Sequence, residues 1–150
     1  MSQTRDITSE YRLKRVLKAA TLSTVFQAAD PHSDQEVAIK LLSPAGAVAG
    51  KDKRERFLHA MEAIKSSGLD SFPRLIDVGF TPESSAFMVM ELAHGAGLDT
   101  LAGQPPARLL PILMQVAVAL EDLAKKGVWH HNLSPDNLLV GDDDSVLPRF

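Results

Sequence analysis

The sequence of 150 residues predicts an α+β fold: a five-stranded, mostly antiparallel sheet with one packed helix, followed by a second helix and a β-hairpin. Three observations predict it. Short runs that mix apolar and polar residues recur up to residue 91, as in the strands of an antiparallel sheet. One run with helical spacing interrupts them at 51–66. A longer run with helical spacing follows at 107–125.

The five strands of the sheet are expected at 11–17, 24–29, 36–42, 74–80 and 86–91. Turn-forming residues at 30–34 and 81–85 separate neighbouring strands. The third run shows the clearest alternation, because Val37 and Ile39 fall on one face of the strand and Lys40 on the other.

The first helix is expected at 51–66, with Gly68 as its C-terminal cap. Its apolar residues fall at helical spacing: Phe57, Leu58, Met61 and Ile64. Its first turn is basic: Lys51, Lys53, Arg54 and Arg56. This charge has the wrong sign for the helix dipole, which indicates either a weak first turn or a basic surface patch.

The second helix, at 107–125, is apolar almost all round and ends at Gly127, so it needs neighbours on several sides. Two short strands, at 138–140 and 146–149, are expected to close the chain as a hairpin. The acidic run 142–144 in its turn lacks the ligand spacing of a calcium loop, and a solvated turn is expected there.

Composition excludes several classes of protein. The net charge is −3, from 16 Lys and Arg against 19 Asp and Glu, so nucleic-acid binding is not expected. The chain has no cysteine, which excludes disulfide scaffolds, cysteine-bound zinc, iron–sulfur clusters and thiol catalysis. Residues 1–10 lack the apolar region of a signal peptide, and the longest apolar stretch, 109–120, is too short to span a bilayer. We therefore expect a cytoplasmic protein that binds neither nucleic acid nor membrane.

Three segments, taken in order, resemble a known family. Residues 37–40 read Val-Ala-Ile-Lys, residues 90–93 read Met-Glu-Leu-Ala, and residues 130–139 read His-His-Asn-Leu-Ser-Pro-Asp-Asn-Leu-Leu. They resemble the lysine strand, the hinge and the catalytic loop of protein kinases. The resemblance is greatest to bacterial eukaryotic-like (Hanks-type) Ser/Thr protein kinases, in a degenerate and truncated form, and it covers about residues 11–150.

The resemblance implies three parts: a polar N-terminal tail at 1–10, a kinase-like N-lobe with its hinge at 11–93, and a partial C-lobe at 94–150. The helix at 51–66 would be the single helix (αC-type) of the N-lobe. The family's Asp-Phe-Gly motif would begin about where Phe150 stands, so the C-lobe is expected to end at or before that motif.

The resemblance also implies a nucleotide-binding cleft. Its residues would be Leu17, Val25, Ala38, Lys40, Met90, Glu91, Ala93 and Leu139. Lys40 stands where the family has its ATP-anchoring lysine. The alternative interpretation is that Lys40 is a strand lysine with a solvated tip, and that the apolar residues only fill the core.

The glycine-rich loop that cradles phosphates in this family is not retained. Lys18, Ala20 and Ser23 occupy its three glycine positions, and each carries a Cβ where the backbone would approach the phosphates. Phosphate cradling is therefore expected to be poor, although Lys18 adds positive charge. The helix glutamate that pairs with the lysine falls on Ala60, and Glu62 lies about 200° further round the helix.

The catalytic loop has no intact catalytic residue. Asn132, which follows His130 and His131, replaces the aspartate that accepts the proton of the substrate hydroxyl. An amide is not a general base, and loss of a positioned base costs about 10²–10⁴-fold in rate. Ser134 replaces the family's lysine, whereas Asn137, at a magnesium-ligand position, is retained.

Three functions remain open. The main hypothesis is a pseudokinase, a regulatory or binding protein with a partly retained nucleotide cleft, because several separate contributions to phosphoryl transfer are lost together. The alternative is a weakly active or partner-completed Ser/Thr protein kinase that transfers phosphate from ATP. The third is a structural remnant without activity. ATP and magnesium are the cofactors that the resemblance implies, with weak binding.

A partner surface is expected on the second helix. In the family this helix is buried in a large helical lobe, most of which this sequence lacks. We therefore expect the apolar residues Leu109, Leu113, Val116 and Leu120 to contribute to binding of a protein partner or to self-association. The alternative is that the chain is a portion of a longer protein.

Overall fold

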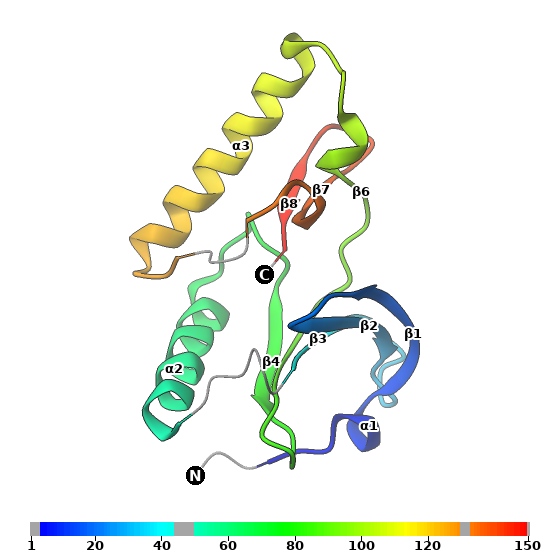
Figure 1. Cartoon of the computed structure of the whole chain (residues 1–150), viewed down its shortest axis with the longest axis vertical. Helices are drawn as coiled ribbons and strands as arrows, with labels where there is room; N and C mark the ends of the chain where they lie inside the picture. Colours follow the sequence, from blue (N-terminus) through cyan, green and yellow to red (C-terminus); the bar gives the residue numbers. More distant parts are fainter. Residues whose placement is uncertain (1–3, 44–49, 130–132, 150) are drawn as a thin grey trace. The chain divides into compact units, whose positions relative to one another are not determined.

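The computed structural model describes residues 4–43, 50–129 and 133–149. The chain forms two compact units, and each is described by itself. The first comprises Met1–Ser66 and Leu75–Leu92, and the second Ser67–Arg74 and Ala93–Phe150. The α+β fold expected from the sequence is confirmed (Figure 1).

The first unit is built on a five-stranded sheet with the strand order β1-β2-β3-β5-β4, in which every neighbouring pair is antiparallel. The strands are β1 (Arg12–Ala19), β2 (Ser23–Ala29), β3 (Glu36–Leu42), β4 (Leu75–Phe80) and β5 (Ala86–Glu91). The sequence placed all five within two residues of these bounds. The alternation of apolar residues therefore suffices to locate each strand.

One face of this sheet carries a buried core cluster. Its members are Ile7, Ala28, Val37, Ile39, Phe87 and Val89. Because side chains alternate along a strand, the residues between them face the opposite side of the sheet. Gly79 of β4 lies against the ring of Phe87: a Cβ built there would be 2.9 Å from the ring's Cζ atom.

Helix α2 (Lys51–Ser67) contacts Phe80 of β4, which follows Gly79 on the strand and therefore faces away from this cluster. The rings of Phe57 on α2 and Phe80 on β4 meet edge to face, with centroids 6.0 Å apart. The guanidinium of Arg54 lies over the same Phe80 ring, 4.2 Å from its centroid. These two contacts hold the N-terminal part of α2 against the sheet, although the basic charge of its first turn opposes the helix dipole.

Residues 4–10, part of the polar N-terminal tail expected at 1–10, contact the first sheet. From Thr4 on, the chain follows the edge of β4, where the backbone N–H of Arg5 donates to the carbonyl of Phe80 at 2.8 Å. Helix α1 (Ile7–Glu10) follows, and Ile7 is buried in the core cluster. The Arg5 guanidinium pairs with Glu10 and, at 2.7 Å, with Asp77.

The second unit combines one long helix with a small three-stranded sheet. Its elements are β6 (Ala96–Gly97), η2 (Leu98–Leu101), α3 (Pro106–Lys125), η3 (Pro135–Asn137), β7 (Leu138–Val140) and β8 (Val146–Pro148). Strand order is β6-β7-β8, and α3 packs against β8. The sequence predicted the β7–β8 hairpin but not β6, which is only two residues long.

Helix α3 buries one stripe and exposes another. Ile112, Val116, Ala119 and Leu123 are buried. The large apolar residues exposed on α3 are Leu110, Leu113, Met114 and Val118. The prediction that Val116 belongs to an exposed partner surface is therefore wrong, because Val116 is buried. Leu109 and Leu120, which were predicted for the same surface, are half-buried. Among the described residues, no helix combines the length and the apolar character that crossing a membrane requires.

Candidate functional site

The face of the first sheet that carries Lys40 is the candidate site. Val37 and Ile39 on β3 belong to the core cluster, so Ala38 and Lys40 face the other side. Both are buried, each with 7% of its surface exposed. A lysine this buried is unusual, because its ammonium group loses hydration. The structure therefore disagrees with the interpretation of Lys40 as a strand lysine with a solvated tip.

Strand register brings four of the predicted nucleotide-binding residues onto this one face. Lys40 pairs with Val25 on β2, and Ala38 pairs with Met90 on β5. Residues directly opposite each other in an antiparallel pair point to the same side of the sheet. Met90 is also buried, and Val25 is half-buried. These four residues together form a mainly apolar surface with one ammonium group.

The remaining predicted binding residues lie elsewhere. Leu17 lies at an irregularity of β1 and is exposed, and Glu91 ends β5. Ala93 and Leu139 belong to the second unit, where Leu139 is buried in β7 between Gly97 and Leu147. The first unit by itself therefore contains only part of the predicted nucleotide-binding residues.

The turn between β1 and β2 occupies the place of the family's glycine-rich loop, which the sequence analysis found not to be retained. The backbone N–H of Ala20 donates to the carbonyl of Ser23 at 2.9 Å, which closes a tight hairpin without glycine. The N–H of Ser43 donates to the Leu22 carbonyl, also at 2.9 Å. Lys18, just before the turn, is half-buried, whereas every other residue of β1 is exposed.

The predicted catalytic-loop residues are only partly described. His130 and Asn132 lie outside the described residues. Asn137 is buried at the end of η3, and its carbonyl accepts from the backbone N–H of Arg149 at 2.7 Å. The Arg149 side chain donates to the carbonyl of Asp136, and burial lowers the pKa of its guanidinium.

Of the magnesium ligands that the resemblance implies, the described residues include only Asn137. Within the described ranges, no group of three or more His, Asp or Glu side chains is placed to hold a metal ion. The carboxylate of Asp143 accepts from the hydroxyl and the backbone N–H of Ser145, which lowers its pKa. Asp144 pairs with Arg108 at 3.0 Å. One neutral oxygen alone does not hold a divalent cation.

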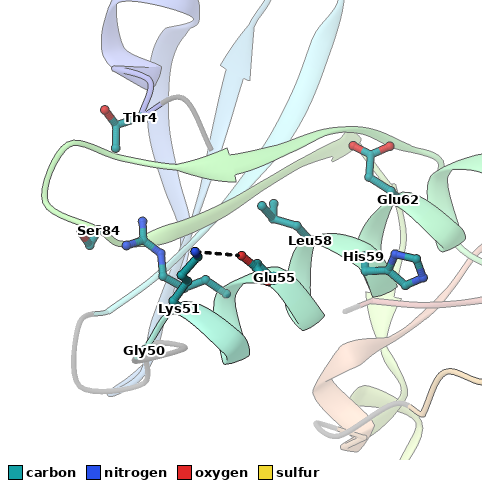
Figure 2. Close-up of a pocket in the computed structure, with 9 residues that line it drawn as sticks. Thr4, Gly50, Lys51, Glu55, Leu58, His59, Glu62 and Ser84 are labelled. Carbon is teal, nitrogen blue, oxygen red and sulfur yellow. Dashed lines mark ion pairs between the residues drawn. The ribbon is translucent and has the colours of Figure 1, made fainter. Parts of the chain in front are cut away.

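A cavity of about 850 Å³ lies elsewhere in the first unit, along α2 (Figure 2). It is lined by Thr4, Gly50, Lys51, Arg54, Glu55, Leu58, His59, Glu62 and Ser84. Figure 2 shows Glu62 at the far end of the cavity from Lys51 and Ser84. The sequence analysis did not predict this cavity. The available signal was the basic first turn of α2, because Lys51 and Arg54 of that turn line the cavity.

The family comparison identifies the architecture. The family model described as protein tyrosine and serine/threonine kinase matches residues 11–147. A probable serine/threonine-protein kinase, pknA2 of Bifidobacterium longum, is 29% identical over 147 residues, which cover 93% of this chain and 19% of that protein. The serine/threonine-protein kinase PknD of Mycobacterium tuberculosis is 28% identical over 140 residues, which cover 89% of this chain and 20% of that protein.

Solved structures agree in fold. The kinase domain of Mycobacterium tuberculosis PknI superposes with a TM-score of 0.78 at 23% identity, covering 94% of this chain and 59% of that domain's chain. The chain thus spans about a fifth of the length of these curated relatives.

Proposed function

Since this chain belongs to the protein tyrosine and serine/threonine kinase family, we propose that it is a pseudokinase, which binds a nucleotide and a protein partner without transferring phosphate. In this proposal it acts as a regulatory module in signalling. It would work in the cytoplasm, where ATP is available.

The observation that carries the proposal is Asn132, at the position where the family has its catalytic base. The amide nitrogen has no lone pair available for a proton, and the amide oxygen is too weak a base to deprotonate a hydroxyl. The three glycine positions of the phosphate loop are also occupied by other residues, Lys18, Ala20 and Ser23. Since the base and the phosphate loop contribute separately to phosphoryl transfer, their joint loss favours binding over catalysis.

The nucleotide part of the proposal rests on the face that carries Lys40. Val25, Ala38 and Met90 supply a flat apolar surface beside it, which suits a purine base. The buried ammonium of Lys40 suits an anionic group of the same ligand.

A phosphoryl-transfer assay tests the pseudokinase assignment. The purified chain is incubated with labelled ATP, magnesium and a generic protein substrate, beside Lys40→Met and an active Ser/Thr kinase. We expect no transfer above the Lys40→Met level. Transfer by the wild-type chain that Lys40→Met abolishes would instead support the second candidate, a weakly active Ser/Thr kinase, which the retained Lys40 and Asn137 favour.

A thermal-shift titration with ATP tests the nucleotide part. Ligand at 100 times its dissociation constant adds about 2.7 kcal/mol to stability, which corresponds to a shift of roughly 5–10 °C for a domain of this size. We expect a shift that Lys40→Ala abolishes. No shift at millimolar ATP would contradict nucleotide binding and leave the partner-binding role to be tested alone.

A further inference from the structure

The cavity along α2 follows one stripe of that helix. The helical residues that line it are spaced by one, three or four positions: Lys51, Arg54, Glu55, Leu58, His59 and Glu62. Residues at such spacing share one face of a helix. With a rise of about 1.5 Å per residue, the stripe from Lys51 to Glu62 is about 16 Å long. This length and the volume of about 850 Å³ exceed what a single ion needs.

One end of the cavity is cationic. The guanidinium of Arg54 lies 4.2 Å from the centroid of the Phe80 ring, a cation–π contact that fixes its position. Within the described part of the chain, no carboxylate pairs with Arg54, and its buried Nε atom has no hydrogen-bond partner. Lys51 pairs with Glu55 at 4.0 Å, and both side chains are mostly exposed, so this pair is weak. Two cations against one carboxylate leave this end with a net positive charge.

The positive charge at this end is a cost to the helix. The first turn of a helix already carries the positive end of the dipole, so cationic side chains are unfavourable there. The side chain of Lys51 is 88% exposed, so packing does not account for its presence. An anionic group bound in the cavity would be stabilised by Lys51, by Arg54 and by the dipole together.

The other end of the cavity is acidic. Figure 2 shows Glu62 at this end, with Leu58 between it and Lys51. Glu62 is exposed, and among the described residues its carboxylate pairs with no Lys, Arg or His. Leu58 is half-buried. A complementary ligand therefore carries an anionic group, an apolar group and a cationic group, in that order along the cavity.

A short stretch of polypeptide fits these dimensions. An extended chain advances about 3.3 Å per residue, so about five residues cover the length of about 16 Å. Its acidic and basic side chains would then stand about four or five positions apart, with an apolar side chain between them.

We propose that the cavity along α2 binds an extended peptide segment of a protein partner. An acidic side chain of the segment lies against Lys51 and Arg54, an apolar one against Leu58, and a basic one against Glu62. The inference rests on the partner-binding part of the proposed function, and it assigns that partner a chemistry and a surface.

Peptide selection against the full chain is the first test. A displayed library of random peptides about seven residues long is selected on the immobilised chain, and an enriched peptide is then titrated by calorimetry. We expect enrichment of sequences with an acidic and a basic residue about four or five positions apart and an apolar residue between them. Enriched sequences without this charge pattern would overturn the proposal.

Charge variants locate the bound peptide. Lys51→Glu and Glu62→Gln are each expected to weaken the enriched peptide about tenfold, as the loss of one charged contact implies. Lys53→Glu is the matched control, because Lys53 is exposed in the same turn but does not line the cavity, and it should change the affinity less than about twofold. Neither change to glutamate should lower the melting temperature, because an acidic residue in the first turn suits the helix dipole.

The remaining outcomes are distinct. An equal loss in Lys51→Glu and Lys53→Glu would indicate attraction by overall charge and overturn the site. Displacement of the peptide by inorganic phosphate, beyond that caused by sodium chloride of the same ionic strength, would indicate a simple anion site and overturn it as well.

Failure of this site can be told apart from failure of the proposed function. Peptide binding that Lys51→Glu leaves intact and Met114→Lys removes would overturn the site on α2 but retain a partner-binding function, on α3. If no peptide is enriched, the peptide site is overturned, while the thermal shift with ATP decides the nucleotide part of the proposed function separately.

Discussion

At Gly79 the main chain of β4 touches the fully buried ring of Phe87. Replacing Gly79 with alanine would place a methyl group 2.9 Å from the ring's Cζ atom, so the ring or the strand must move. We expect a loss of about 1–3 kcal/mol in the free energy of unfolding, measured by urea denaturation.

A double variant checks this explanation. If the clash with the ring is the cause, Gly79→Ala should cost much less in a Phe87→Leu background, because the smaller side chain leaves room for the methyl group. Additive losses in the double variant would show that the cost arises from the backbone of β4 instead.

For some residues of the site, the sequence alone predicts the face of the sheet on which the side chain lies. The run at 37–40 placed Lys40 on the correct face, because alternation fixes side-chain direction along a strand. The resemblance implied that Lys40 lies in a cleft, but alternation alone could not predict its burial, since that depends on β2 and β5 lying on both sides of β3. Lys18 was noticed only as added charge, because its placement depends on the irregularity of β1.

At the scale of elements, Gln115 connects α3 to the β7–β8 hairpin. Its side-chain NH₂ donates to the carbonyl of Asp144 at 2.9 Å, and its side-chain oxygen accepts from the backbone N–H of Val146 at 3.0 Å. One side chain thus bonds to the turn on one side and to β8 on the other.

Replacing Gln115 with alanine removes both bonds and should cost about 1–2 kcal/mol. The sharper readout is hydrogen exchange of the Val146 amide, which should accelerate in this variant. Glu121→Ala is the control, since Glu121 is exposed on the same helix and pairs with Lys125. Unchanged exchange at Val146 would mean that α3 does not hold the hairpin through this residue.

Long periodic elements were predictable, and very short ones were not. Helix α1 is a single turn of four residues, too short for periodicity to detect. Its N-cap is the Asp6 carboxylate, which accepts from the backbone N–H of Thr8, and it is held by burial of Ile7 against the sheet. Those tertiary contacts are invisible in a local pattern, which is why the sequence analysis predicted no helix within residues 1–10.

For the whole molecule, the exposed stripe of α3 predicts association. Four large apolar side chains are about half exposed or more, with Met114 at 69%. Such a stripe favours contact with a partner or with a second copy. We expect the purified chain to show an apparent mass above 16.3 kDa that rises with concentration in sedimentation experiments.

The double variant Met114→Lys/Val118→Lys should reduce this association without loss of stability, because both side chains are exposed. Val16→Lys, on an exposed apolar residue of β1, is the matched control and should associate like the wild type. A monodisperse wild-type monomer that binds no hydrophobic dye would contradict the prediction.

The N-terminal segment also bears on solubility. The five-stranded sheet has two outer strands, and an outer strand with unpaired N–H and carbonyl groups is a template for intermolecular β-pairing and fibril growth. Residues Thr4 and Arg5 cover part of the β4 edge, while β1 at the other edge carries two irregularities and four cationic side chains. Both edges of the sheet are therefore protected from amyloid-like growth. Thr4 and Arg5 protect the β4 edge, and cationic side chains and irregular pairing protect the β1 edge.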